Sequence, residues 1–126
     1  MIGFLLITHA PLGHAFLQAT KHVFQGEPER IEAIDVIADQ NVDDIHQLAL
    51  AAIARLNDGA GVLVLTDMRG GTPSNCCHEL GEPHEVAVIA GISLPMLLRA
   101  ISYRQKSLDE VVELALAGGH NGVARI

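Results

Sequence analysis

Residues 61–75 read Gly61-Val62-Leu63-Val64-Leu65-Thr66-Asp67-Met68-Arg69-Gly70-Gly71-Thr72-Pro73-Ser74-Asn75, and the rest of the chain can be interpreted around them. The segment opens with an apolar run of valine and leucine, which is typical of a buried strand in a parallel sheet. An acidic residue, Asp67, stands where this strand ends, and a pair of glycines follows it as a loop. Threonine is a good N-cap and proline is favoured at the first helical position, so a helix is predicted to begin at Thr72.

A strand that ends in an acid, a glycine loop and a helix start together make a candidate anion site. The N–H groups of a first helical turn have no partner inside the helix, and the helix dipole favours negative charge there. The side chains of Thr72, Ser74 and Asn75 add further donors. We therefore predict that Gly70, Gly71, Thr72 and Ser74 bind a phosphoryl group.

The composition is that of a single domain, and we assign residues 1–126 to it. A chain of 126 residues is long enough for one substantial core. Apolar residues make up 49% and aromatic residues only 3%, so leucine, isoleucine, valine and alanine must build that core. The net charge is −7 with only eight Lys and Arg residues, and no basic cluster is visible, which argues against a nucleic-acid partner.

The cysteines and the N-terminus indicate a cytoplasmic protein. Cys76 and Cys77 are adjacent and cannot easily form a disulfide with each other, which fits a reducing compartment. The apolar residues 1–7 are too short to span a membrane and lack the basic segment of an export signal. No metal-ligand spacing is present, so we expect neither a metal nor another cofactor. We interpret the histidines other than His9 mostly as surface or capping residues: His14, His22, His46, His78, His84 and His120.

Strands and helices are predicted to alternate along the chain. Besides the strand that opens the 61–75 segment, apolar runs predict strands at residues 2–7, 31–37 and 86–90. Helical periodicity and capping signals predict helices from Leu12 to near Gly26, from a cap at Asn41 or Asp43 to Leu56, from Thr72 to about Gly81, from Leu94 to the turn at Arg104, and from about Leu108 to Ala117. The pair Gly118-Gly119 is expected to end the last helix, and residues 122–126 are a possible short extra strand.

This alternation predicts an α/β fold with an open, mostly parallel four-stranded sheet and helices on both faces. In such sheets ligands bind beyond the carboxyl ends of the strands, where the strand order reverses. His9 follows the first strand and Asp67 follows the third. If these strands are neighbours, as in a flavodoxin-like order, the two side chains come within reach of each other.

The pair of His9 and Asp67 is suited to phosphoryl transfer. A neutral imidazole is a nucleophile near working pH, and it can accept a phosphoryl group on one ring nitrogen and release it again. The other nitrogen must be held as a donor, and the Asp67 carboxylate can do this while stabilising the charge that develops on the ring. Phosphoryl transfer depends mostly on positioning and electrostatics, so no metal is strictly required.

Three segments resemble the IIA domain of the mannose/fructose/sorbose family of the sugar phosphotransferase system (PTS). They are Thr8-His9 with the helix that follows, Leu65–Asn75, and Ala90-Gly91-Ile92-Ser93-Leu94-Pro95-Met96-Leu97. The resemblance implies a phosphotransferase component, an EIIA, in which His9 takes a phosphoryl group from the phosphocarrier HPr and passes it to a IIB component. It also implies that Asp67 hydrogen-bonds this histidine, that membrane contact runs only through IIC and IID proteins, and that the chain forms a homodimer in which a C-terminal strand can pair across the interface.

The chain departs from the family pattern beside the predicted site. Ala10-Pro11 follows the histidine where glycine is usual, Met68-Arg69 follows the aspartate where an aromatic residue is common, and Ser93 replaces an asparagine. These differences bear on partner choice and rate rather than on His9 and Asp67. Among nearby residues, Arg69, Pro95 and Met96 are candidates for docking a partner protein.

Other functions fit the same residues. His9 could be phosphorylated as a regulatory signal without sugar uptake, or the chain could be the subunit that relays phosphate to dihydroxyacetone kinase. A receiver-like domain phosphorylated on Asp67 would need a Mg²⁺ site with carboxylates after the first strand, which this chain does not have. A hydrolase built on Ser74, His9 and Asp67 lacks the strand-to-helix elbow that such a serine requires.

Overall fold

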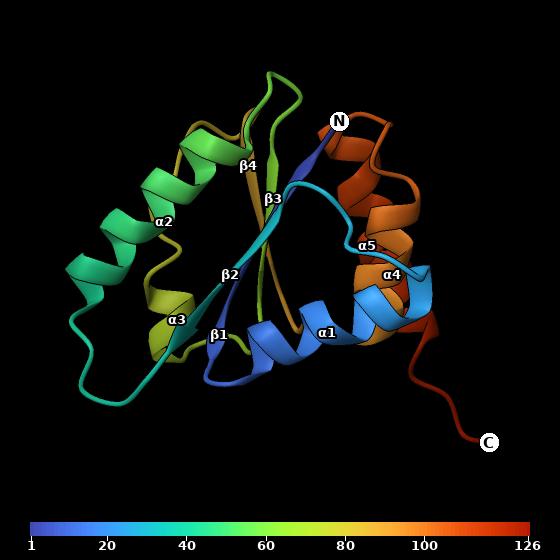
Figure 1. The fold of residues 1–126 in the computed structure, drawn as a ribbon, viewed down its shortest axis with the longest axis horizontal. Helices are drawn as coiled ribbons and strands as arrows, with labels where there is room; N and C mark the ends of the chain where they lie inside the picture. Colours follow the sequence, from blue (N-terminus) through green and yellow to red (C-terminus); the bar gives the residue numbers. More distant parts are fainter.

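The computed structural model describes residues 1–126 and contains one four-stranded sheet (Figure 1). Its strands are β1 (Gly3–His9), β2 (Ile31–Val36), β3 (Val62–Thr66) and β4 (Val86–Ala90). All strand pairs are parallel, and the order across the sheet is β2-β1-β3-β4. The predicted open α/β fold with a flavodoxin-like order is therefore confirmed.

Five helices cover the two faces of the sheet. They are α1 (Leu12–Phe24), α2 (Val42–Leu56), α3 (Thr72–Asn75), α4 (Leu94–Ser102) and α5 (Leu108–Asn121). In Figure 1, α2 and α3 lie on one side of the sheet, and α1, α4 and α5 lie on the other. None of the helices is both long and apolar enough to span a membrane.

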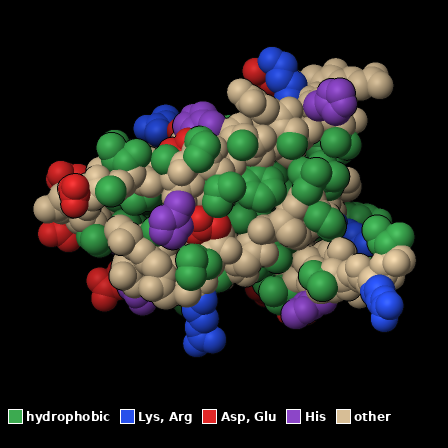
Figure 2. Space-filling model, turned by 90° about the horizontal axis from the view of Figure 1, so that it is seen from below, with side chains coloured by type: hydrophobic (Ala, Val, Ile, Leu, Met, Phe, Trp, Pro, Cys, Tyr) green, Lys and Arg blue, Asp and Glu red, His purple; other side chains and the backbone are tan.

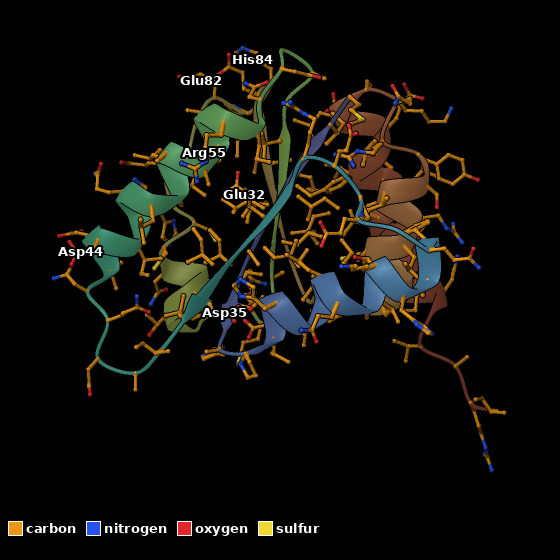
Figure 3. All side chains as sticks on the ribbon, in the orientation of Figure 1. Glu32, Asp35, Asp44, Arg55, Glu82 and His84 are labelled. Atoms are coloured by element: carbon orange, nitrogen blue, oxygen red, sulfur yellow. The ribbon has the colours of Figure 1, made fainter.

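Side chains of the central strands point alternately to the two faces of the sheet, and this produces two separate cores. Phe4 and Leu6 of β1 belong to the core under α4 and α5, whereas Leu5 and Ile7 belong to the core under α2. Successive strand residues point to opposite faces, so a central strand covered on both sides must be apolar throughout. At the β2 edge, Arg55 of α2 reaches Glu32 (Figure 3), with Nη2 2.8 Å from Oε1, which ties that helix to the sheet.

Side chains cap three helices, and two of these caps, Asn41 and Ser107, were predicted. Asn41 caps α2 by accepting from the backbone N–H of Asp43 at 2.8 Å. The Ser107 hydroxyl caps α5 by accepting from the N–H of Glu110, and it also donates to the carboxylate of Glu110, the second residue of the predicted capping box. Ser93, one of the departures from the family pattern, caps α4 by accepting from the N–H of Met96 at 3.3 Å.

Two helix predictions need correction. The helix after the glycine loop is a single turn that stops at Asn75 rather than near Gly81, and Gly71 rather than Thr72 is its N-cap. The last helix does not end at Gly118-Gly119 but continues to Asn121. A Cβ at Gly118 would lie 2.9 Å from the Cβ of Arg99, so this glycine lets α5 approach α4 closely instead of ending the helix.

Two strand predictions also need correction. The apolar run at 86–90 is typical of a strand buried on both faces, but β4 is an outer strand of the sheet and leaves Val88 exposed. Residues 122–126 form no strand, and the C-terminal tail extends away from the body of the molecule (Figure 1). Val123 and Ile126 of this tail are exposed, so nothing in the chain covers their apolar side chains.

The amino-terminal end of the sheet is held by a buried cation. Arg104 follows α4 and is only 7% exposed. Its guanidinium donates to the backbone carbonyls of Ile2, Glu29 and Arg30 at 2.6 to 3.2 Å, and it lies over the ring of Phe4 with 4.9 Å to the centroid. Burial, and then the charge of nearby Arg30, lower the pKa of Arg104 below its ordinary value.

Candidate active site

The candidate active site lies at the carboxyl edge of the sheet, where β1 and β3 end side by side. Ile7 pairs with Thr66 in the parallel ladder, so His9, the last residue of β1, and Asp67, which follows β3, lie at the ends of neighbouring strands. Figure 2 looks onto this end of the molecule and shows histidine side chains beside carboxylate groups at the surface. The sequence-based expectation that the two residues come within reach is confirmed by their distance.

Asp67 makes a double contact with His9. Its Oδ2 accepts from the backbone N–H of His9 at 2.9 Å and lies 2.7 Å from the imidazole Nδ1. Its Oδ1 accepts from the backbone N–H of Met68 at 2.9 Å. Because both carboxylate oxygens are engaged, the carboxylate cannot rotate freely, and Nδ1 must carry a proton to complete the contact.

The electrostatics keep Asp67 ionised. Burial by itself raises the pKa of this carboxyl, but the hydrogen bonds from the backbone and ring of His9, the charge of that ring and the N–H of Met68 outweigh it, so the net pKa lies below 3.8. The Asp67 side chain is 11% exposed, whereas the His9 side chain is 47% exposed. A shielded carboxylate thus holds a ring that solvent and a partner can reach.

The second ring nitrogen, Nε2, faces the glycine loop. It takes part in no hydrogen bond in the structure. A Cβ added at Gly71 would lie 3.1 Å from Cε1 and 3.5 Å from Nε2 of His9, so a larger residue in the loop would press on the ring at its present position. Gly70 adopts φ +86, a conformation that side chains rarely tolerate, and it turns the chain away from β3. With Nδ1 bound to Asp67, Nε2 is the nitrogen whose lone pair is available.

The other predicted site residues are placed unequally. Thr72 is exposed and Ser74 is partly buried, and they form the first turn of α3 next to Gly71. Arg69 and Pro95 are exposed, as a docking residue must be. Met96 is buried in the core under α4, so the prediction that it docks a partner is wrong: its side chain packs in this core beside Gly119 of α5 rather than facing solvent.

No cluster of histidine, cysteine and carboxylate groups could hold a metal ion. The neighbouring cysteines are poor nucleophiles. Burial raises the pKa of the Cys76 thiol, and burial together with that neighbour raises the pKa of Cys77 to about 12. Both thiols therefore stay protonated at neutral pH.

One feature of this edge was missed in the sequence. His14, in the first turn of α1, contacts Asp35 through its backbone N–H and its Nδ1, as His9 contacts Asp67, although Asp35 uses one oxygen for each contact. Figure 3 shows Asp35 near the end of β2, beside the start of α1. The available signal was an acid near a predicted strand end and a histidine at a predicted helix start, but nothing in the sequence shows that they meet.

Known proteins of similar sequence belong to one family. Residues 3–116 match the profile of the family described as "PTS system fructose IIA component". The chain is 33% identical over 125 residues to the PTS system mannose-specific EIIAB component of Escherichia coli K12. This alignment covers 97% of the chain but only 38% of the longer relative. It is 31% identical over 110 residues to the PTS system sorbose-specific EIIA component of Lacticaseibacillus casei, with 86% of this chain and 78% of that protein covered.

A solved structure has the same fold. The crystal structure of phosphotransferase system component EIIA from Streptococcus agalactiae superposes with a TM-score of 0.88 at 25% identity, and the alignment covers 99% of this chain and 97% of that one. The profile match spans most of the chain, and the relatives agree in name and in fold. The chain therefore belongs to the EIIA family of the sugar phosphotransferase system whose members include mannose-, sorbose- and fructose-specific components.

Proposed function

We propose that this protein is a cytoplasmic phosphoryl carrier that accepts a phosphoryl group on Nε2 of His9 and passes it on. The observation that carries the proposal is the Asp67 carboxylate, 2.7 Å from Nδ1, which leaves Nε2 as the free nitrogen of a half-exposed ring. A ring held in this tautomer presents its lone pair to a donor without first losing a proton.

The transfer needs no proton movement. The lone pair of His9 Nε2 attacks the phosphorus of a phosphohistidine donor, and the donor nitrogen leaves with the electron pair of the broken P–N bond. The ring of His9 then carries positive charge, which the Asp67 carboxylate at Nδ1 stabilises. The reverse steps deliver the phosphoryl group to an acceptor. A carrier must release the group again, so the pair of His9 and Asp67 should stabilise the phosphorylated ring only moderately.

The glycine loop is the proposed seat of the phosphoryl oxygens. Gly71 lies next to Nε2, and a group bound there is close to the start of α3. The N–H groups of Thr72 and Ser74 belong to the first turn and have no acceptor within this one-turn helix. Together with the side-chain hydroxyls, they provide neutral donors for a dianionic group.

The donor we propose is the phosphocarrier HPr and the acceptor is a IIB component. An apolar groove of about 200 Å³ lies between α1 and the start of α4 and is lined by Leu12, Ala15, Phe16, Ala19 and Leu94. Leu12 and Met68 expose further apolar surface near His9. Exposed apolar patches beside a reactive group are typical of transient protein docking, and Arg69 adds a charge that can pair with a partner carboxylate.

We also propose that the protein forms a homodimer through its C-terminal tail. The outer edge of β4 has no partner strand in the chain, and the apolar tail residues are exposed. Open strand edges are usually covered or paired in natural proteins. Light scattering should report a dimer for the full chain and a monomer after removal of residues 122–126.

The carrier proposal is tested by following a phosphoryl group through the protein. The chain is mixed with phosphoenolpyruvate, enzyme I, HPr and a IIB component, and phosphohistidine is mapped by mass spectrometry under alkaline conditions. The wild-type protein should carry label on the peptide that contains His9, and the His9→Ala variant should pass no label to IIB. Transfer to IIB by the variant at the wild-type rate, or a wild-type protein without label on His9, would overturn the proposal.

A further inference from the structure

The pair of His14 and Asp35 repeats the arrangement of the proposed site on the neighbouring strand. The Asp35 Oδ2 lies 2.8 Å from the His14 Nδ1, and its Oδ1 accepts from the backbone N–H of His14 at 3.3 Å. The Asp35 side chain is 19% exposed and the His14 side chain is 63% exposed. As at His9, a shielded carboxylate fixes one ring nitrogen and leaves Nε2 free.

A pocket of about 400 Å³ opens beside His14, between α1 and the segment that leads into β2. Gln18 and Lys21 line it from the same face of α1, because residues four and seven positions after His14 follow the helical repeat. Glu27 lies on the opposite wall and pairs with Lys21 at 3.0 Å. This ion pair is exposed at both ends and contributes little stability, so Lys21 can turn to another anion in the pocket.

Capping of α1 accounts for only part of this arrangement. Pro11 at the N-cap position makes no side-chain cap, and the contact of Asp35 with the N–H of His14 supplies one from another strand. That contact needs only the backbone of residue 14. The additional contact with the ring nitrogen fixes the tautomer and orientation of an exposed imidazole, which capping does not require.

We propose that His14 is a second phosphoryl-accepting residue, oriented by Asp35 and served by Gln18 and Lys21 as contacts for the phosphoryl oxygens. The inference rests on the phosphoryl chemistry proposed for His9. The His14 Nε2 lone pair forms a bond to phosphorus, the P–N bond of a nitrogen-linked phosphoryl donor breaks, and the leaving nitrogen keeps the electron pair. The proton stays on Nδ1, where the carboxylate balances the positive charge of the phosphorylated ring.

The test uses the His9→Ala protein, so that only other sites can be labelled. One sample receives phosphoramidate and a second receives phosphoenolpyruvate, enzyme I and HPr, which separates a small donor from a protein donor. Phosphohistidine is then mapped by mass spectrometry under alkaline conditions. We expect label on His14, lost to background in His9→Ala/His14→Ala and slowed about tenfold in His9→Ala/Asp35→Asn. The His14→Ala change retains the backbone contact with Asp35, so this variant should fold, and circular dichroism checks that it does.

His22 provides the matched control, because it is exposed on the same helix and has no carboxylate partner. Label on His14 with either donor, above that on His22, supports the inference, and the donor that works identifies the source. The inference is overturned if neither donor labels His14, or if His14 carries no more label than His22. The wild-type sample distinguishes this failure from failure of the carrier proposal, because label on His9 with none on His14 overturns only the present inference.

Discussion

The two ends of the sheet use charged side chains in opposite ways. At the amino end, the Arg104 guanidinium is buried and donates to several backbone carbonyls. At the carboxyl end, Asp67 is equally well bonded, but the His9 that it holds keeps one nitrogen free and is half exposed. A polar group that has all its partners holds the fold together, whereas one that is fixed on one side and open on the other can do chemistry.

The largest expected effect concerns the amino end. Arg104→Met keeps the apolar stem but leaves the carbonyls of Ile2 and Glu29 without their side-chain donor, and we expect the free energy of unfolding to fall by about 3 kcal/mol. Urea denaturation followed by circular dichroism measures the change. Phosphorylation of His9 in the variant that remains folded should be unchanged, because the two ends share no contacts.

Lys106→Ala is the matched control for this variant, because Lys106 is exposed and only approaches Glu110 at 3.9 Å. Its free energy of unfolding should stay within about 0.5 kcal/mol of the wild-type value. A loss at Arg104→Met no greater than at Lys106→Ala would mean that the buried guanidinium does not hold the amino end together, and the contrast between the two ends would be lost.

The next effect concerns the carboxyl end. In the proposed transfer, Asp67→Asn removes the negative charge that would stabilise the phosphorylated ring, and it weakens the preference for the tautomer with a proton on Nδ1. We expect the rate of His9 phosphorylation to fall about 100-fold, which is about 2.7 kcal/mol in activation free energy. Rapid-quench labelling from phospho-HPr measures it. Asp35→Asn is the control: it removes the same charge from the other pair, and labelling of His9 should stay within about twofold.

How much of this could be predicted depended on whether a feature is set by the topology or by packing. The meeting of His9 and Asp67 followed from strand ends, because parallel strands place their carboxyl ends at one edge. The pairing of His14 with Asp35 depends on where α1 crosses β2, which no local pattern encodes. Met96 was misassigned for the same kind of reason, since the sequence of α4 does not say which of its faces is buried against other elements.

Glycines show the same limit. Gly118-Gly119 has the pattern of a helix end, yet it allows α5 to pack against α4, and that contact exists only after both helices are placed. The glycine loop before α3 was recognised from the sequence, but the approach of Gly71 to the His9 ring was not, because the distance depends on how β1 and β3 bring the two segments together.

This approach of Gly71 leads to a smaller effect. Gly71 has an ordinary φ of −99, so Gly71→Ala costs little in backbone conformation, but the added methyl would press on the ring at 3.1 Å from Cε1. We expect the ring to shift and the rate of His9 phosphorylation to fall about tenfold. The same rapid-quench assay measures it.

Gly26→Ala is the control for that change, because a Cβ at Gly26 would meet nothing within 4 Å. Its rate of His9 phosphorylation should equal that of the wild type. An unchanged rate in Gly71→Ala as well would show that the loop does not define the position of the ring, and the carboxyl end would then depend on Asp67 alone.

The smallest effect is in the pH dependence of stability. The contacts of Asp67 outweigh its burial and hold its pKa below 3.8, so the folded protein binds a proton there less readily than the unfolded chain. The contribution of this carboxylate is therefore complete above the unfolded pKa and is lost as the pH falls through the lower folded pKa. The free energy of unfolding of the wild type, measured by urea denaturation, should exceed that of Asp67→Asn by a constant amount near neutral pH, and the difference should shrink below about pH 4. A difference that grows as the pH falls would mean that the carboxylate is destabilising in the folded state, and its role as a well-bonded support for His9 would have to be abandoned.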